Sequence, residues 1–77
     1  MQHSELYVGQ YIERNDNKIV GIVQNIYAED AYLTVRTAPY NEIIEVGFEE
    51  LELWEDGLTD EGIRVLFQGR EQDDHRG

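Results

Sequence analysis

The chain has no cysteine and few basic residues, and each of these shortages excludes a class of structure or function. Without cysteine it forms neither disulfides nor thiolate metal sites. Lysine and arginine together number 6 against 17 acidic residues, which gives a net charge of −11. No positive stripe is therefore available to neutralise phosphates. We expect neither direct nucleic-acid binding nor docking on an anionic membrane surface.

Long hydrophobic runs are also missing. No apolar segment approaches the roughly 20 residues that a membrane span needs. The first residues lack the basic start and the apolar middle of a signal peptide, so we expect a cytoplasmic protein.

Catalytic machinery is scarce as well. The two histidines, His3 and His75, lie in polar terminal stretches, where no rigid scaffold can hold them against a nucleophile. The acidic loops do not match the spaced ligands of a calcium loop. We expect no catalytic residues, no metal site, no cofactor and no enzyme activity.

The sequence does contain enough apolar residues for a folded domain. It has 77 residues, of which 40% are hydrophobic, and a chain of this size builds one modest core. Residues 1–77 are therefore expected to form a single domain. The polar ends, residues 1–5 and 71–77, are expected to be flexible.

The longest apolar run, Lys18–Tyr27, is rich in β-branched residues and predicts a central strand that bends at Gly21. Ala31–Thr37 alternates strictly, which predicts a half-buried strand with Leu33 and Val35 inward. Polar turns separate these runs, at residues 38–41 around the only proline and at residues 47–50. Three further strands are predicted at Tyr7–Glu13, Glu42–Val46 and Leu51–Trp54.

The C-terminal part changes character after Gly57. Thr59 can cap a helix whose first turn carries Asp60 and Glu61, and Gly69 is a candidate stop. The run from Ile63 to Phe67 also fits a sixth strand, so residues 59–68 are open between helix and strand. The fold class predicted is mainly β, a five-stranded antiparallel barrel with a short C-terminal helix or sixth strand.

The order of these signals resembles small SH3-like barrels of the KOW type over residues 8–54. The resemblance rests on the entry Val8-Gly9-Gln10-Tyr11-Ile12, on the strand Gly21-Ile22-Val23, and on a tight turn followed by a Leu-x-Leu strand within Phe48–Leu53. It implies a binding module for proteins or RNA. The loops here lack the basic residues of the RNA-binding members, which favours protein contact.

Acidic residues concentrate in the second half of the chain. Between residues 42 and 61 there are nine acidic residues and no basic one. Such a surface can steer a basic protein partner, and exposed aromatic residues would anchor it. Alternation places Trp54 away from Leu51 and Leu53, and Tyr32 outward. The predicted partner-binding residues are Tyr32, Glu45, Glu49, Glu50, Glu52, Trp54, Glu55 and Asp56.

Other interpretations of the acidic block stay open. Charges along a short terminal strand protect a sheet edge from aggregation and need no partner. Carboxylates spaced like phosphates would imitate nucleic acid, as in inhibitors that phages and mobile elements use against host DNA- or RNA-binding proteins. The chain could equally be a structural subunit of a larger assembly. A helix that folds back over Trp54 would remove it from any interface.

Overall fold

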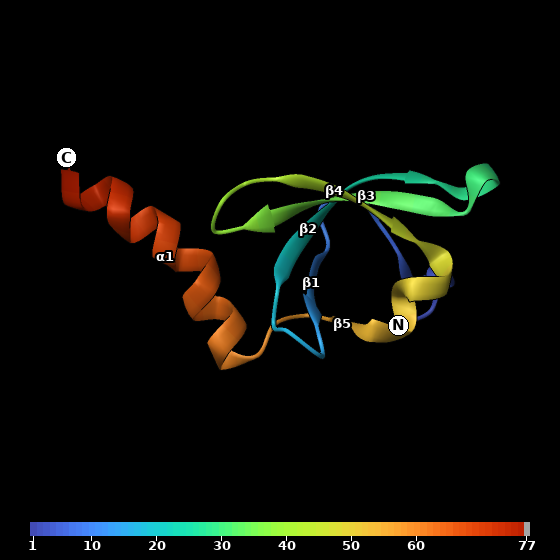
Figure 1. Cartoon of the computed structure of the whole chain (residues 1–77), viewed down its shortest axis with the longest axis horizontal. Helices are drawn as coiled ribbons and strands as arrows, with labels where there is room; N and C mark the ends of the chain where they lie inside the picture. The colour runs from blue at the N-terminus through green and yellow to red at the C-terminus, as the bar shows by residue number, and fades with distance from the viewer. Residues whose placement is uncertain (77) are drawn as a thin grey trace.

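The computed structural model describes residues 1–76, with the side chains of residues 1–68. It is mainly β, with five antiparallel strands in one sheet of order β4-β3-β2-β1-β5 and a C-terminal helix (Figure 1), which confirms the predicted fold class. The strands are β1 (Tyr11–Arg14), β2 (Val20–Tyr27), β3 (Tyr32–Ala38), β4 (Ile43–Gly47) and β5 (Trp54–Asp56). The helices are η1 (His3–Glu5), η2 (Ala28–Asp30), η3 (Phe48–Leu53) and α1 (Asp60–Arg76).

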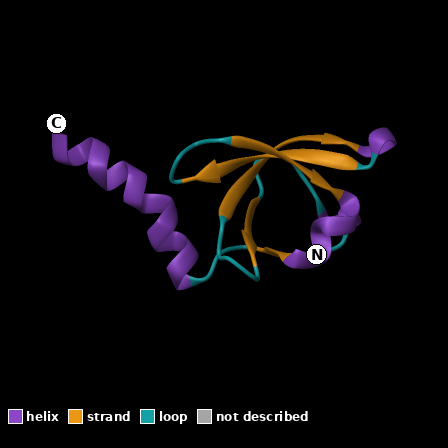
Figure 2. Cartoon of the chain, in the orientation of Figure 1, coloured by secondary structure: helices purple, strands orange, loops and turns teal. Residues whose placement is uncertain are grey.

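Strand β2 lies at the centre of the sheet, between β1 and β3, as its apolar sequence predicts. Val20 and Val23 are 0% and 1% exposed. On β3, Leu33 and Val35 are both fully buried, so the inward face predicted from alternation is confirmed. The strands curl round this core (Figure 2).

The predicted bend at Gly21 stays a prediction. An irregularity of the sheet lies further along the strand, where the register between β2 and β3 shifts between Val23 and Asn25, two residue pairs beyond the pair of Gly21 and Thr37. Gly21 makes room for a side chain of the neighbouring strand, because a Cβ there would overlap the Val35 side chain. Glycine at this site therefore lets Val35 of β3 pack over the backbone of β2.

The segment after β4 corrects two predictions. A 3₁₀ helix, η3, replaces the single tight turn and most of the predicted strand Leu51–Trp54, and β5 begins only at Trp54. In a 3₁₀ helix residues three apart share a face. Leu51 and Trp54 therefore both point inward, at 2% and 0% exposure. The alternation that placed Trp54 outward does not apply to a helical segment.

The first strand is shorter than predicted. It starts at Tyr11 rather than Tyr7, because Gly9 has a φ of +93° that breaks the extended chain. Val8 is 61% exposed and does not share a buried face with Ile12, which is fully buried. The Gly9 N–H still donates to the Val23 carbonyl at 2.9 Å, so the entry runs beside β2 without continuing β1.

The N-terminal segment contacts η3 and β5. The Met1 ammonium donates to the carbonyl oxygens of Leu51 and Trp54, each at 3.1 Å. The His3 ring stacks on Phe48 with ring centres 5.2 Å apart. The flexibility expected of residues 1–5 stays a prediction, and the side chains of residues 71–77 lie outside the described part.

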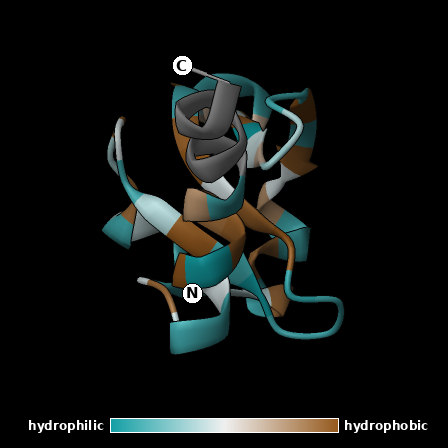
Figure 3. Cartoon of the chain, turned by 90° about the vertical axis from the view of Figure 1, so that its left-hand side faces the viewer, coloured by the Kyte–Doolittle hydropathy of each residue, from teal (hydrophilic) through white to brown (hydrophobic). Residues whose placement is uncertain are grey.

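Helix α1 settles the alternatives for residues 59–68 in favour of a helix. Thr59 caps it as predicted, because its hydroxyl accepts the Gly62 N–H at 3.1 Å. The predicted stop at Gly69 is wrong, since the helix runs to Arg76. Figure 1 shows that α1 leaves the sheet and projects from it, and the molecule measures 43 × 20 × 17 Å. In Figure 3, which faces this end, the hairpin loops are hydrophilic and the apolar stretches lie mainly in the strands.

Among the residues that the structure describes, no helix has both the length and the apolar character needed to cross a membrane.

Candidate functional site

Trp54 is not an exposed anchor, which corrects its place in the predicted partner-binding set. Its side chain is fully buried in a cluster with Ile12, Leu33 and Leu51. Its indole Nε1 has no hydrogen-bond partner in the described part of the chain, and the Arg14 guanidinium lies 6.0 Å from the ring centre. No residue of α1 belongs to the described core cluster, so the suggestion that the helix covers Trp54 does not hold either.

Four of the predicted carboxylates are free for contact. Their side chains are exposed and make no hydrogen bond or ion pair within residues 1–68. They are Glu45 on β4, Glu49 and Glu52 on η3, and Glu55 on β5. These elements follow one another in space from one sheet edge to the other (Figure 1), so the four charges follow the same path.

The other two predicted carboxylates are used by the fold. Glu50 is half-buried, and its Oε2 accepts the Gly47 N–H at 3.1 Å, which satisfies a backbone donor at the start of η3. Asp56 accepts the Gln10 side-chain amide at 3.0 Å, and Gln10 is only 1% exposed. A sequence-based charge count cannot distinguish these two from the free carboxylates, because the partners are a backbone amide and a distant glutamine.

The structure does bring Tyr32 and Glu45 together. Tyr32 is half-buried on β3 and stacks on Tyr27 with ring centres 4.8 Å apart. Burial is the main cause that raises the pKa of the Tyr32 phenol, followed by the charges of Glu45, Tyr27 and Asp30. Glu45 lies on the neighbouring strand, opposite Thr34. This corner of the sheet therefore combines an aromatic pair with negative charge.

The basic side chains, in contrast, are largely occupied. Arg14 pairs with Asp16 at 2.8 Å, and that hydrogen bond is the first cause that lowers the pKa of the Asp16 carboxyl. Lys18 lies 4.0 Å from the buried carboxylate of Glu13. Arg36 donates to the Gln24 side chain at 3.1 Å. Cations thus offset few of the exposed carboxylates on β4, η3 and β5.

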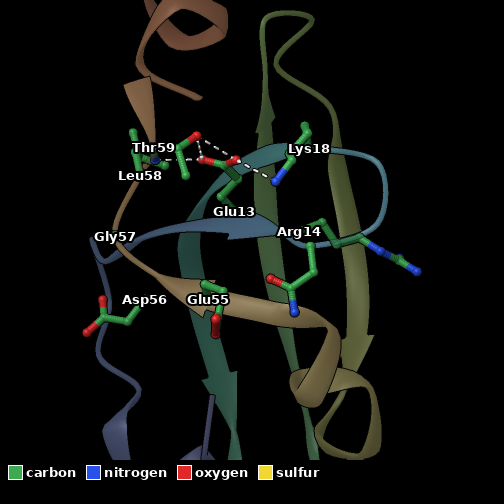
Figure 4. Close-up of a pocket in the computed structure, with 9 residues that line it drawn as sticks. Glu13, Arg14, Lys18, Glu55, Asp56, Gly57, Leu58 and Thr59 are labelled. Atoms are coloured by element: carbon green, nitrogen blue, oxygen red, sulfur yellow. Dashed lines mark hydrogen bonds and ion pairs between the residues drawn. The ribbon is translucent and has the colours of Figure 1, made fainter. Parts of the chain in front are cut away.

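Sequence reasoning missed Glu13, which lies 3% exposed beside the start of α1. Its carboxylate accepts the Thr59 N–H at 2.8 Å and the Thr59 hydroxyl at 2.8 to 2.9 Å (Figure 4). A pocket of about 250 Å³ opens beside it, rimmed by Glu55 and Asp56. A charged residue in a short strand normally faces water, so the sequence gives no sign that Glu13 is buried.

The side chains around this pocket are not arranged for acid–base catalysis or for metal binding. The Glu13 oxygens are already committed to Thr59, so the carboxylate is positioned as a helix cap rather than as an acid or base. Within the described residues, no group of three or more histidine, cysteine or acidic side chains could hold a metal ion.

A second depression is more apolar. A groove of about 400 Å³ lies between the 38–41 turn, the start of β4 and α1. Its apolar lining comes from Ile19, Pro39, Tyr40, Ile44 and Val65.

In comparisons with known proteins, no family model, no curated protein and no solved structure matches this chain.

Proposed function

We propose that the protein is a non-enzymatic interaction module that presents an acidic surface to a basic protein partner. The observation that carries the proposal is the imbalance between free carboxylates and occupied cations. Glu45, Glu49, Glu52 and Glu55 are exposed without a described partner, while Arg14, Lys18 and Arg36 each contact another side chain. Such a field accelerates the approach of a positively charged protein and disfavours acidic ones.

An aromatic contact on this surface would come from Tyr32 and Tyr27 rather than from Trp54. Tyr27 is 40% exposed and its ring stacks on Tyr32, beside Glu45. A stacked tyrosine pair next to a carboxylate suits an arginine or lysine side chain, which is attracted by both the ring faces and the charge. The interface we propose is centred on Tyr32 and Glu45 and extends over η3 to Glu55.

We also propose an SH3-like architecture of the KOW type and a cytoplasmic location. Pairing of β1 with both β2 and β5 supports the first, because it brings the last strand back to the first. The acidic surface supports protein rather than RNA as the partner of such a barrel.

The experiment is affinity capture with mass spectrometry, using the wild-type chain and a charge-reversed variant. The variant carries Glu45→Lys, Glu49→Lys and Glu52→Lys, which touch no described hydrogen bond. We expect basic proteins to bind wild type, to be lost with the variant, and to elute as salt shortens the screening length below about 8 Å. Partners that the reversed variant retains equally would refute the proposal.

A structural subunit is a second candidate, because the surface also carries large apolar groups. Tyr40 is 81% exposed and Ile43 is 56% exposed, and α1 projects from the sheet. An assembly built on these groups would persist at high salt, where an electrostatic complex dissociates. A protein that imitates nucleic acid would give a third result, because its captured partner would release DNA or RNA when this protein binds.

A further inference from the structure

The sheet has two edge strands, and one of them is covered. Strand β5 has only three residues, and the outward carbonyl of Trp54 already accepts the Met1 ammonium at 3.1 Å. The Met1 side chain also lies against this edge, because its sulfur accepts the Gln10 amide at 3.6 Å. An additional strand cannot pair with β5 without displacing the N-terminal segment.

Strand β4 is the open edge. The Thr37 N–H donates to the Glu42 carbonyl at 2.7 Å, and the Phe48 N–H donates to the Ala31 carbonyl at 2.9 Å. These two bonds identify which residue pairs of the antiparallel ladder are hydrogen-bonded. Alternate residues of β4 bond to β3, and the backbone groups of the residues between them point away from β3. The backbone groups of Ile43 and Glu45 therefore face outward, unpaired by β3.

The open stretch has a defined end. The next outward N–H belongs to Gly47, and it already donates to the Glu50 carboxylate at 3.1 Å. Glu50 thus closes the edge on the side of η3, and only Ile43 and Glu45 offer both backbone groups to another chain.

The apolar groove lies beside this open stretch. Ile44 pairs with Val35, which is fully buried, so the Ile44 side chain points to the inner side of the sheet. There it lines the groove of about 400 Å³ together with Tyr40 and with Val65 of α1. A strand added to β4 would place the residue opposite Ile44 into this groove, since side chains on paired strands share a face.

The charge of the edge selects its occupant. Glu45 and Ile43 share the outer side of β4, and Glu42 and Lys18 both line the groove. A second copy paired through Ile44 would place Glu45 diagonal to the Glu45 of the other chain and would join two chains that each have a net charge of −11. Like charges on paired strands are destabilising, whereas lysine or arginine opposite Glu45 is favourable.

We propose that β4 binds an extended segment of another protein by antiparallel strand addition, with basic residues flanking an apolar one. The basic residues lie opposite Ile43 and Glu45 and exchange backbone hydrogen bonds with them, and the apolar residue enters the groove beside Ile44. This inference rests on the proposed function, for which it names the class of partner and the mode of contact.

The test uses a short peptide, blocked at both ends, in which lysine and valine alternate. With valine in the groove, the lysine backbone N–H groups face β4 and the valine N–H groups face solvent. We therefore compare the peptide N-methylated on its lysine residues with the peptide N-methylated on its valine residues. The two have the same composition and charge, so only strand pairing distinguishes them.

We expect the valine-methylated peptide to bind and the lysine-methylated peptide to bind at least about tenfold more weakly. Exchange of the Ile43 and Glu45 amide hydrogens should slow in the complex. Glu45→Lys should weaken binding by about tenfold, while the matched reversal Glu49→Lys on η3 should change it by less than about threefold.

Equal, salt-sensitive binding of both methylated peptides would overturn strand addition and leave electrostatic docking intact. Binding by neither peptide would also overturn it, and the capture experiment then decides the proposed function separately. Self-association of the chain through β4, seen by analytical ultracentrifugation and lost with Glu45→Lys, would overturn the assignment of the occupant.

Discussion

Replacement of Gly62 by alanine should reveal how tightly α1 is held against β1. In an exposed helix this change stabilises a protein by about 1 kcal/mol, because glycine is a poor helix former. Here a Cβ would overlap the Glu13 carboxylate oxygen and lie 2.9 Å from its Cδ. Glu13 cannot swing into water cheaply, because it is 3% exposed and bonded to Thr59.

The magnitude follows from what the displaced carboxylate loses. It accepts both the N–H and the hydroxyl of Thr59, and hydrogen bonds to a charged group contribute about 1.5 to 3 kcal/mol each. Displacement should cost about 3 kcal/mol, which exceeds the gain of about 1 kcal/mol in helix propensity. Gly62→Ala should therefore lower the free energy of unfolding by about 2 kcal/mol.

Removal of the Glu13 carboxylate should reverse the sign of the effect that Gly62→Ala has on the free energy of unfolding. In a Glu13→Ala background the new methyl group meets no carboxylate, so Gly62→Ala should stabilise by about 1 kcal/mol. In a Glu13→Gln background the amide has the same size, and Gly62→Ala should still destabilise. Urea unfolding followed by Trp54 fluorescence gives each free energy. If Gly62→Ala stabilises the wild-type chain, α1 does not pack on Glu13 as described.

Three further predictions concern Gly21, Trp54 and Tyr32, and each tests a separate part of the fold. Gly21→Ala should destabilise by about 1 to 3 kcal/mol through overpacking against β3, whereas Gly47→Ala, whose Cβ would meet its nearest neighbour at 3.5 Å, should stay within about 0.5 kcal/mol in the same urea assay. Trp54→Ala should cost about 3 to 5 kcal/mol by circular dichroism melting, and iodide should barely quench wild-type fluorescence; strong quenching would contradict burial. The pKa of Tyr32 should lie above the ordinary value of about 10, so its contribution to stability is present below that pH and lost as pH rises through the folded pKa. Glu45→Gln should lower this pKa in an ultraviolet titration. An unchanged pKa would show that the Glu45 charge does not act on the Tyr32 phenol.

The strands were predictable where burial follows a period of two. Leu33 and Val35 alternate with polar residues, and this pattern alone places them in the core of β3. The cap at Thr59 was predictable too, because a hydroxyl followed by acidic residues is local helix chemistry. Both signals act between residues close in sequence.

The features that were not predictable depend on contacts between distant residues. Leu51-Glu52-Leu53 alternates apolar and acidic residues, which suits a strand as well as a 3₁₀ helix. The 3₁₀ helix is favoured in the fold because Leu51 and Trp54 then fill the core together. Burial of Glu13 likewise depends on Thr59, which lies 46 residues away in the chain.

The same distinction decides how the acidic composition should be interpreted. The formal charge counts every carboxylate alike, but Glu13, Glu50 and Asp56 accept hydrogen bonds that hold α1, η3 and Gln10 in place. Neutralising any of these would disturb the fold and would mimic a loss of binding. Only the carboxylates without described partners, such as Glu45 and Glu49, report on docking alone. A binding defect at Glu45 without one at Glu49 would therefore assign the partner to the β4 edge, because both changes alter the net charge equally.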